Sequence, residues 1–237
     1  MKILITGGAG YKGSSLVPAL IQNHQVDVLD HHISPECTLI PFTKKKNFNF
    51  IKKDIRDIKK KDVSKYDLII HLAGLSGYPA CEANPGIAES VNVDSTKNLC
   101  SLMSKNQKLI YASTTYIYEV SNKKINEDSP VNPKTLYAKT KLEAEKICLD
   151  KGNTVSLRFA TIFGTSPTMR HDLLLNDFVK KAVNERNIVL FDQNSLRSFI
   201  HIDDVMRSYL LTIKNFSKMK ENIYNIGSDS MNYSKLQ

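Results

Sequence analysis

A tyrosine and a lysine four residues apart have the chemistry of a proton-abstracting pair. Tyr137 and Lys141 lie in "YAKTK", and this separation places both side chains on one face of a helix. A free tyrosine has a pKa of about 10, so a phenolate base near neutrality needs a downward shift of roughly 3 units, or about 4 kcal/mol. A neighbouring ammonium in a site partly closed to water favours the phenolate in this way. The bare spacing is also common on ordinary helices, so the prediction of a base at Tyr137 depends on its surroundings.

A glycine-rich turn close to the start of the chain predicts a phosphate-binding loop. The segment "TGGAGYKG" follows the apolar run of residues 3–5 and repeats glycine at Gly7, Gly10 and Gly13. A strand that turns at once into a helix leaves the first helical N–H groups unpaired, and a pyrophosphate suits that position. Asp30, at the end of the next predicted strand, has the chemistry to accept hydrogen bonds from ribose hydroxyls and to repel an extra phosphate. These features predict dinucleotide binding, with NAD favoured over NADP.

The elements that would position these residues alternate along the chain. Short β-branched runs alternate with segments of helical period, which predicts an α/β protein with a doubly wound parallel sheet. The predicted strands are 2–6, 26–29, 49–51, 68–72, 108–112, 154–159, 188–190 and 223–226, and the predicted helices are 12–22, 87–104, 134–150, 173–185 and 203–214. The rhythm changes after Gly164. We therefore expect a Rossmann-type domain over 1–165 and a smaller substrate lobe over 166–237, parts of which return to the sheet.

The composition is that of an ordinary globular protein. The 237 residues are 41% hydrophobic and 24% charged, without an apolar run of membrane-spanning length, and we expect a cytoplasmic protein without membrane contact. The formal charge of +9 could indicate nucleic-acid binding, but aspartates are interleaved with the lysines of residues 52–62 and no DNA-reading motif is present. The four cysteines form no CxxC pair, and neither a zinc site nor a disulfide framework is expected.

Further motifs occur in the order of a known family. Together with the Gly-x-x-Gly-x-x-Gly spacing and Tyr-x-x-x-Lys, they resemble the extended branch of the short-chain dehydrogenase/reductase superfamily, specifically the NAD-dependent epimerase/dehydratase family of nucleotide-sugar enzymes. The matching blocks are "DIRD" (54–57), "HLAG" (71–74), "YASTTYIYE" (111–119), "NVDSTKNL" (92–99), "LRFATIFG" (157–164) and "RSFIHIDDV" (197–205).

This resemblance implies a role for each matching residue. Tyr137 would take a proton from a sugar hydroxyl while hydride leaves the same carbon, Lys141 would lower the pKa of Tyr137 and hold the nicotinamide ribose, and Thr114 would bond the reacting oxygen. The implied cofactor-binding residues are Gly7, Gly10, Tyr11, Lys12, Gly13, Asp30, Asp54, Ile55, Leu72, Ala73, Gly74, Asn92, Tyr137 and Lys141. The implied substrate-binding residues are Thr115, Thr161, Arg170, Asn176 and Arg197. His171 and His201 are expected to be structural, and no metal site is expected.

Departures from the family pattern bear on the activity. The 4,6-dehydratases carry an Asp-Glu pair where this chain has Thr115 and Tyr116, so a dehydratase is disfavoured. Lys12 stands where relatives often have an aliphatic residue, and an exposed helical position would explain it. The hypothesis is an NAD-dependent nucleotide-sugar epimerase that forms a transient keto sugar, with a 4-keto reductase, a dehydratase or a non-catalytic dinucleotide-binding protein as alternatives. A homodimer is expected from the family, and the C-terminal lobe looks truncated relative to it, with "NYSKLQ" resembling the start of a helix.

Overall fold

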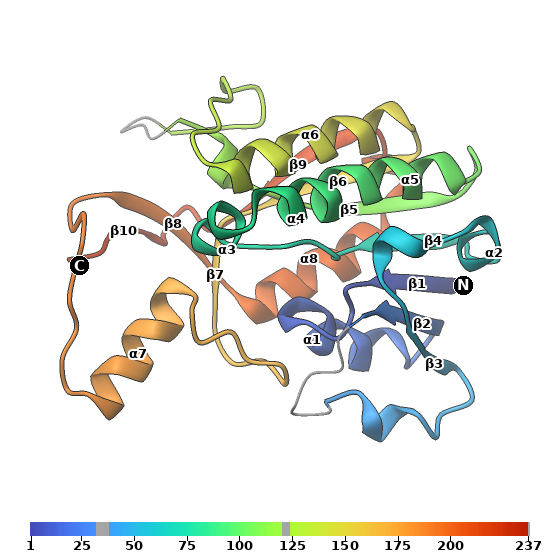
Figure 1. Ribbon diagram of the computed structural model, residues 1–237, viewed down its shortest axis with the longest axis horizontal. Helices are drawn as coiled ribbons and strands as arrows, with labels where there is room; N and C mark the ends of the chain where they lie inside the picture. Colours follow the sequence, from blue (N-terminus) through green and yellow to red (C-terminus); the bar gives the residue numbers. More distant parts are fainter. Residues whose placement is uncertain (32–37, 120–123, 237) are drawn as a thin grey trace.

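The central feature of the structure is a seven-stranded parallel sheet. The computed structural model describes residues 1–31, 38–119 and 124–236, and the sheet has the order β3-β2-β1-β4-β5-β6-β9 (Figure 1). Its strands are β1 (Lys2–Thr6), β2 (Gln25–Asp30), β3 (Phe48–Lys52), β4 (Leu68–His71), β5 (Lys108–Thr114), β6 (Thr154–Phe159) and β9 (Asn222–Ile226). The doubly wound Rossmann-type fold is confirmed, and each of these strands overlaps a predicted one.

Helices cover both faces of this sheet. On one face α1 packs beside α8, and on the other α5 packs beside α6 (Figure 1). The helices are α1 (Tyr11–Leu20), α2 (Lys60–Val63), α3 (Tyr78–Ala83), α4 (Pro85–Glu89), α5 (Ser95–Leu102), α6 (Leu136–Asp150), α7 (Leu174–Asn184), α8 (Ile202–Lys214) and α9 (Phe216–Met219). Among the residues that the structure describes, no helix is long and apolar enough to cross a bilayer.

The strand sequences explain this layering. Successive side chains of a strand point to opposite faces, and in β1 Ile3 and Ile5 join the core beneath α1 and α8, whereas Leu4 joins the core beneath α5 and α6. Both faces of the sheet are thus buried, as the continuous apolar runs of these strands require. Cys81 and Cys148 are buried free thiols and Cys100 is a partly buried one, while Cys37 lies outside the described residues.

A small second sheet and α7 lie to one side of the main sheet. The strands β7 (Thr161–Phe163) and β8 (Leu196–His201) are parallel, and β10 (Asn232–Ser234) is antiparallel to β8. The sequence prediction is wrong here in two places. Residues 188–190 form no strand, since β8 takes the pairing with β7 instead, and the segment that resembled a helix start is β10. The division of the chain at residue 165 stays a prediction.

Candidate active site

The glycine loop joins β1 to α1 and is built by close backbone contacts. Gly7 has φ +69°, and a Cβ there would lie 2.6 Å from the Cα of Ala73. A Cβ on Gly13 would lie 2.4 Å from the Cα of Gly8, so Gly13 allows α1 to approach the turn. These two glycines are required by the protein's own packing.

Gly10 differs from the other two, because a Cβ there would meet only the carbonyl oxygen of Gly7, at 3.5 Å. Gly10 is the N-cap of α1, so no side chain caps the helix, and the first turn of α1 contains no acidic residue. The amide groups at this helix start therefore fit a bound anion, as the pyrophosphate prediction requires. Beside the loop, Asp30 accepts a hydrogen bond from the backbone N–H of Ala9 at 3.0 Å, which places its carboxylate at the edge of the cradle.

The segment after β4 lies against the glycine loop at Gly7 and is held in place by Asn92. Asn92 lies in a π-helical turn (Ser90–Asp94) between α4 and α5, so the helix predicted over 87–104 is present as a continuous helical run from Pro85 to Leu102 with a widened turn in its middle. Its side chain accepts a hydrogen bond from Leu75 N–H at 2.7 Å and donates to Leu75 O and Thr140 Oγ1, both at 3.0 Å. Asn92 thereby fixes the loop of Leu72, Ala73 and Gly74 to α6. Its predicted direct contact with the cofactor stays a prediction.

His71, at the end of β4, links the end of β1 to α5. It is fully buried between the hydroxyls of Thr6 (2.7 Å) and Thr96 (2.9 Å). Burial lowers the pKa of His71 to about 3, with a smaller contribution from Lys141. His71 is therefore a neutral structural link at neutral pH.

Tyr137 lies in the first turn of α6, which begins where Thr135 Oγ1 accepts a hydrogen bond from Ala138 N–H at 3.2 Å. A hydrogen bond with Thr114, at the carboxyl end of β5, favours the phenolate of Tyr137. Arg170 acts in the same direction. The structure thus brings together the predicted base and the predicted hydroxyl partner, which are 23 positions apart in the sequence.

The predicted acidification of Tyr137 by Lys141 stays a prediction, because in the protein alone burial dominates the pKa of the phenol. Burial raises the pKa of Tyr137 to about 12, because desolvation outweighs the help of Thr114 and Arg170. Burial also lowers the pKa of Lys141 to about 8, and its ammonium lies 4.2 Å from the centroid of the Tyr111 ring. A further positive charge beside the phenol is therefore needed to make Tyr137 a base near neutrality.

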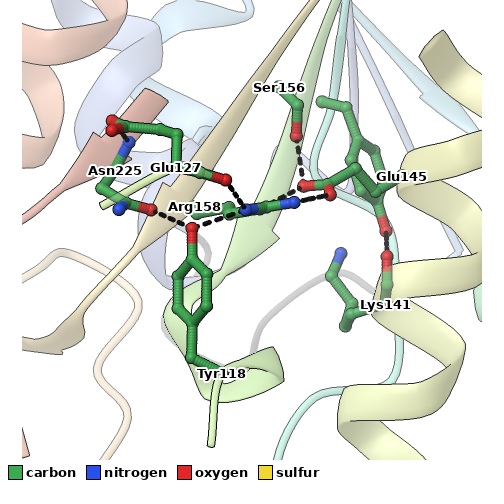
Figure 2. A network of polar contacts seen from close by, with 8 residues as sticks. Tyr118, Glu127, Lys141, Glu145, Ser156, Arg158 and Asn225 are labelled. Carbon is green, nitrogen blue, oxygen red and sulfur yellow. Dashed lines mark hydrogen bonds and ion pairs between the residues drawn. The ribbon is translucent and has the colours of Figure 1, made fainter. Parts of the chain in front are cut away.

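A buried polar network anchors the helix that carries Tyr137 and Lys141 (Figure 2). Glu145, one turn after Lys141, pairs with Arg158 of β6, whose Nη2 lies 2.6 Å from Glu145 Oε1. Ser156 Oγ donates to the same carboxylate at 2.8 Å, and Arg158 Nη1 donates to the Tyr118 hydroxyl at 2.5 Å. Neither Glu145 nor Arg158 was predicted from the sequence. An acidic residue on the inner face of a helix and an arginine inside a buried strand were the available signals.

The predicted substrate residues have different surroundings. Arg170 donates twice to Asp172, at 2.6 and 2.5 Å, and once to the hydroxyl of Ser76 at 2.6 Å. Asn176 is buried, accepts a hydrogen bond from Gly164 N–H at 3.1 Å and donates to Arg170 O at 2.9 Å. Asn176 thus shapes the loop that holds Arg170. Direct substrate contacts of both residues stay predictions.

Arg197 in β8 is the predicted substrate residue best suited to an anion. Its guanidinium lies 5.3 Å from the ring centroid of Tyr116, and its Nε is buried without a hydrogen-bond partner among the described residues. A buried donor without an acceptor is costly unless a ligand supplies one. Thr115 donates to Phe159 O at 3.3 Å, and Thr161 is half-buried in β7.

The predicted adenine-side segment follows β3. Asp54 caps the short helical turn Ile55–Asp57 and forms a paired contact with Arg56, with Arg56 Nη2 2.6 Å from Asp54 Oδ2. The hydrogen bond from Arg56 is the main cause that lowers the pKa of Asp54 to about 2. Ile55 is buried and anchors the turn. The geometry leaves the backbone of this turn at the sheet edge beyond Asp30, and contact with an adenine stays a prediction.

Lys12 is the site residue whose surroundings differ most from the sequence prediction. An exposed helical position was expected, but the side chain is half-buried and its Nζ lies 5.0 Å from the centroid of the Phe159 ring. Burial, followed by the charges of Lys141 and Arg170, lowers the pKa of Lys12 to about 7. Lys12 therefore faces the same region as the two other cations.

Comparisons with known proteins agree with this geometry. The family model for the NAD dependent epimerase/dehydratase family matches residues 3–227. Protein CapI of Staphylococcus aureus is 31% identical over 234 residues, covering 90% of this chain and 70% of that protein. The dTDP-D-glucose 4,6-dehydratase of Homo sapiens is 28% identical over 247 residues, covering 96% of this chain and 69% of that enzyme. The crystal structure of UDP-glucuronic acid 4-epimerase from Bacillus cereus, in complex with UDP-glucuronic acid and NAD, superposes with a TM-score of 0.90 at 27% identity and covers 100% of this chain and 80% of that one.

Proposed function

Because this chain belongs to the NAD-dependent epimerase/dehydratase family, we propose that it is a nucleotide-sugar epimerase that forms a transient keto sugar. The observation that carries the proposal is the meeting of Tyr137 and Thr114 beside the cationic groups at the carboxyl end of the sheet. The structural relatives are crystallised with NAD, and the cradle around Gly10 and Asp30 fits a dinucleotide. The nucleotide-diphosphate sugar is the proposed substrate.

In the proposed oxidation of a sugar alcohol, each residue of the site has a separate role. Tyr137 takes the proton from the hydroxyl, and Thr114 hydrogen-bonds the same oxygen. Arg170 lowers the pKa of the Tyr137 phenol, which burial raises to about 12, and Lys141, one helical turn away, is the second cation proposed to act on it. An oxidised cofactor, when bound, would add the remaining positive charge. When bound, NAD supplies the hydride acceptor. An epimerase returns the hydride to the opposite face of the sugar, so cofactor is not consumed.

The surroundings of Thr115 and Tyr116 argue against a dehydratase. Elimination of water requires an acid and a base at neighbouring carbons of the sugar. Thr115 donates its hydroxyl proton to Phe159 O, and Tyr116 is 41% exposed, with its ring 5.3 Å from the Arg197 guanidinium. Neither residue replaces the Asp-Glu pair expected from the resemblance.

The proposal extends to the protein's surroundings. We propose that the protein works in the cytoplasm, pairs with a second copy through the face of α5 and α6, and binds no nucleic acid. Within one chain α5 and α6 lie side by side on one face of the sheet, which is the arrangement that a four-helix contact between two copies would use. Light scattering coupled to size-exclusion chromatography gives the mass in solution and tests the pairing.

The test is conversion of a panel of UDP-, GDP- and dTDP-sugars in the presence of NAD, followed by NMR. Isomerised product without net cofactor reduction supports an epimerase, whereas a product formed only with stoichiometric NADH indicates the 4-keto reductase. Binding of NAD without conversion of any sugar in the panel indicates the non-catalytic alternative. Proton loss from the sugar hydroxyl without Tyr137 would contradict the mechanism.

The matched variant for this test is Tyr137→Phe. We expect turnover to fall at least about 100-fold, the usual contribution of a positioned acid or base, while the dissociation constant for NAD changes less than about threefold. Tyr233→Phe, which removes the hydroxyl of an exposed tyrosine in β10, serves as the control and should leave turnover unchanged. Equal turnover of Tyr137→Phe and the parent protein overturns the assignment of the base.

A further inference from the structure

Lys12 occupies an unusual electrostatic position. It is the second residue of α1, directly after the glycine turn, and its side chain reaches to Phe159 at the end of β6. Its Nζ lies 5.0 Å from the Phe159 ring centroid, and the ring centroids of Phe159 and Tyr209 of α8 are 5.3 Å apart. Among the described residues, none provides a carboxylate or a carbonyl oxygen in hydrogen-bond contact with this Nζ.

The charged groups around Lys12 come from α6 and from the segment before α7. Lys141 of α6 and Arg170, before α7, both repel its ammonium. Asp172 is engaged by Arg170 in a paired contact, and the phenols of Tyr137 and Tyr11 interact with the same arginine. Burial and this repulsion bring the pKa of Lys12 to about 7, so adding another cation nearby is unfavourable.

A dinucleotide bound between Gly10 and Tyr137 would extend alongside the Lys12 amine. Its pyrophosphate fits the cradle at Gly10, and the ring that accepts hydride must lie beside Tyr137 for the proton and the hydride to leave one carbon. Lys12 begins in the first of these regions, and its Nζ lies 5.0 Å from the ring centroid of Phe159. Phe159 of β6 pairs in register with Thr114 of β5, the hydrogen-bond partner of Tyr137, so the amine reaches the second region. The amine is therefore close to the acceptor ring, which carries a positive charge when oxidised and none when reduced.

We propose that Lys12 places a positive charge beside the hydride-accepting ring and makes the site prefer the reduced over the oxidised cofactor. Repulsion between the ammonium and the oxidised ring weakens NAD+ binding and leaves NADH binding unaffected. In the proposed reaction this preference favours the step that oxidises the sugar. A contact of Lys12 with the pyrophosphate would instead strengthen both forms equally, which gives the two explanations different outcomes.

The experiment compares dissociation constants for NAD+ and NADH at pH 6.5, where Lys12 is mostly protonated, without any sugar nucleotide. In Lys12→Met we expect the ratio Kd(NAD+)/Kd(NADH) to fall by about tenfold, equivalent to about 1.4 kcal/mol. Lys12→Arg, which retains the charge, should keep the parent ratio. Lys139→Met is the matched control, because it removes one lysine from the exposed face of α6.

Several results overturn the inference. If Lys12→Met and the parent protein have the same ratio Kd(NAD+)/Kd(NADH), the charge of Lys12 does not act on the ring. If Lys12→Met binds NAD+ and NADH more weakly by the same factor, Lys12 contacts the pyrophosphate. Lys12→Gln repeats the comparison if the methionine variant does not melt cooperatively. The inference rests on the dinucleotide site of the proposed function. Failure of the parent to bind either form refutes that site, whereas binding of both with an unchanged ratio refutes only the role of Lys12.

Discussion

Arg158→Met tests the network that anchors the helix carrying Tyr137 and Lys141. The substitution keeps a long side chain but removes the guanidinium from Glu145, whose side chain is 1% exposed. Glu145 loses the Nη2 contact at 2.6 Å and the Nε contacts at 3.1 and 3.2 Å, and retains the hydroxyl of Ser156 at 2.8 Å. Removal of one partner from a buried ion pair costs about 3–5 kcal/mol, because the other charge stays buried without compensation.

Protonation sets an upper limit to this penalty. A glutamic acid side chain with its ordinary pKa of about 4.3 takes up a proton at pH 7 at a cost of about 3.7 kcal/mol, and at pH 5 at about 1 kcal/mol. The folded variant would hold this proton at pH values where the unfolded chain has released it. Its stability relative to the parent therefore rises as the pH falls. We expect a loss of about 3–4 kcal/mol at pH 7 that shrinks by about 2–3 kcal/mol at pH 5.

Equilibrium urea denaturation followed by circular dichroism at both pH values measures these losses. The double variant Glu145→Leu/Arg158→Met is the matched control, since it removes both charges and should lose less than the single variant at pH 7, with little dependence on pH. Equal losses of the single variant at pH 5 and pH 7, or a double variant that is less stable than the single one, would refute the reasoning.

Three other perturbations address the glycine loop, the cofactor preference and acid stability. Gly13→Ala should destabilise the protein by about 2–3 kcal/mol, because its Cβ would lie 2.4 Å from Gly8. Gly10→Ala, with only a 3.5 Å contact, should melt like the parent protein but bind NAD at least about tenfold more weakly. Thermal melting measures the stability and calorimetric titration the affinity, and equal effects of the two substitutions would contradict the proposed phosphate-binding loop. Asp30→Ala should shift the ratio of NAD to NADP affinity toward NADP by about tenfold, because the carboxylate beside Ala9 N–H no longer repels a ribose phosphate. An unchanged ratio of the two dissociation constants would show that Asp30 does not contact the ribose. His71 has its pKa lowered to about 3, so the unfolded chain binds a proton that the folded chain refuses and stability falls as the pH drops through the window from 6.5 to 3. Between pH 6.5 and 4.5 this contribution is about 2 kcal/mol, and parallel urea midpoints for the parent and His71→Asn over that range would show that His71 is not its source.

Much of the fold could be predicted because its signals are local. The apolar runs of β1, β4, β5 and β6, the helical period around Tyr137 and the glycine repeat are each contained in one short segment. The small second sheet could not be predicted in this way. β10 has three residues, and β8 joins β7 and β10 through partners far away in the chain, so pairing and not sequence pattern decides which segment becomes a strand.

For the site, the sequence by itself determined which groups are available: a phenol and an amine one helical turn apart, a hydroxyl at the end of β5, and a turn with the least possible side chain. Only the tertiary structure decided how these groups behave. The raised pKa of Tyr137, the half-buried amine of Lys12 above Phe159, and the pairing of Glu145 with Arg158 all result from burial and from residues distant in the sequence. Desolvation and charge depend on the neighbours that the fold brings within a few ångströms, and no local pattern contains that information.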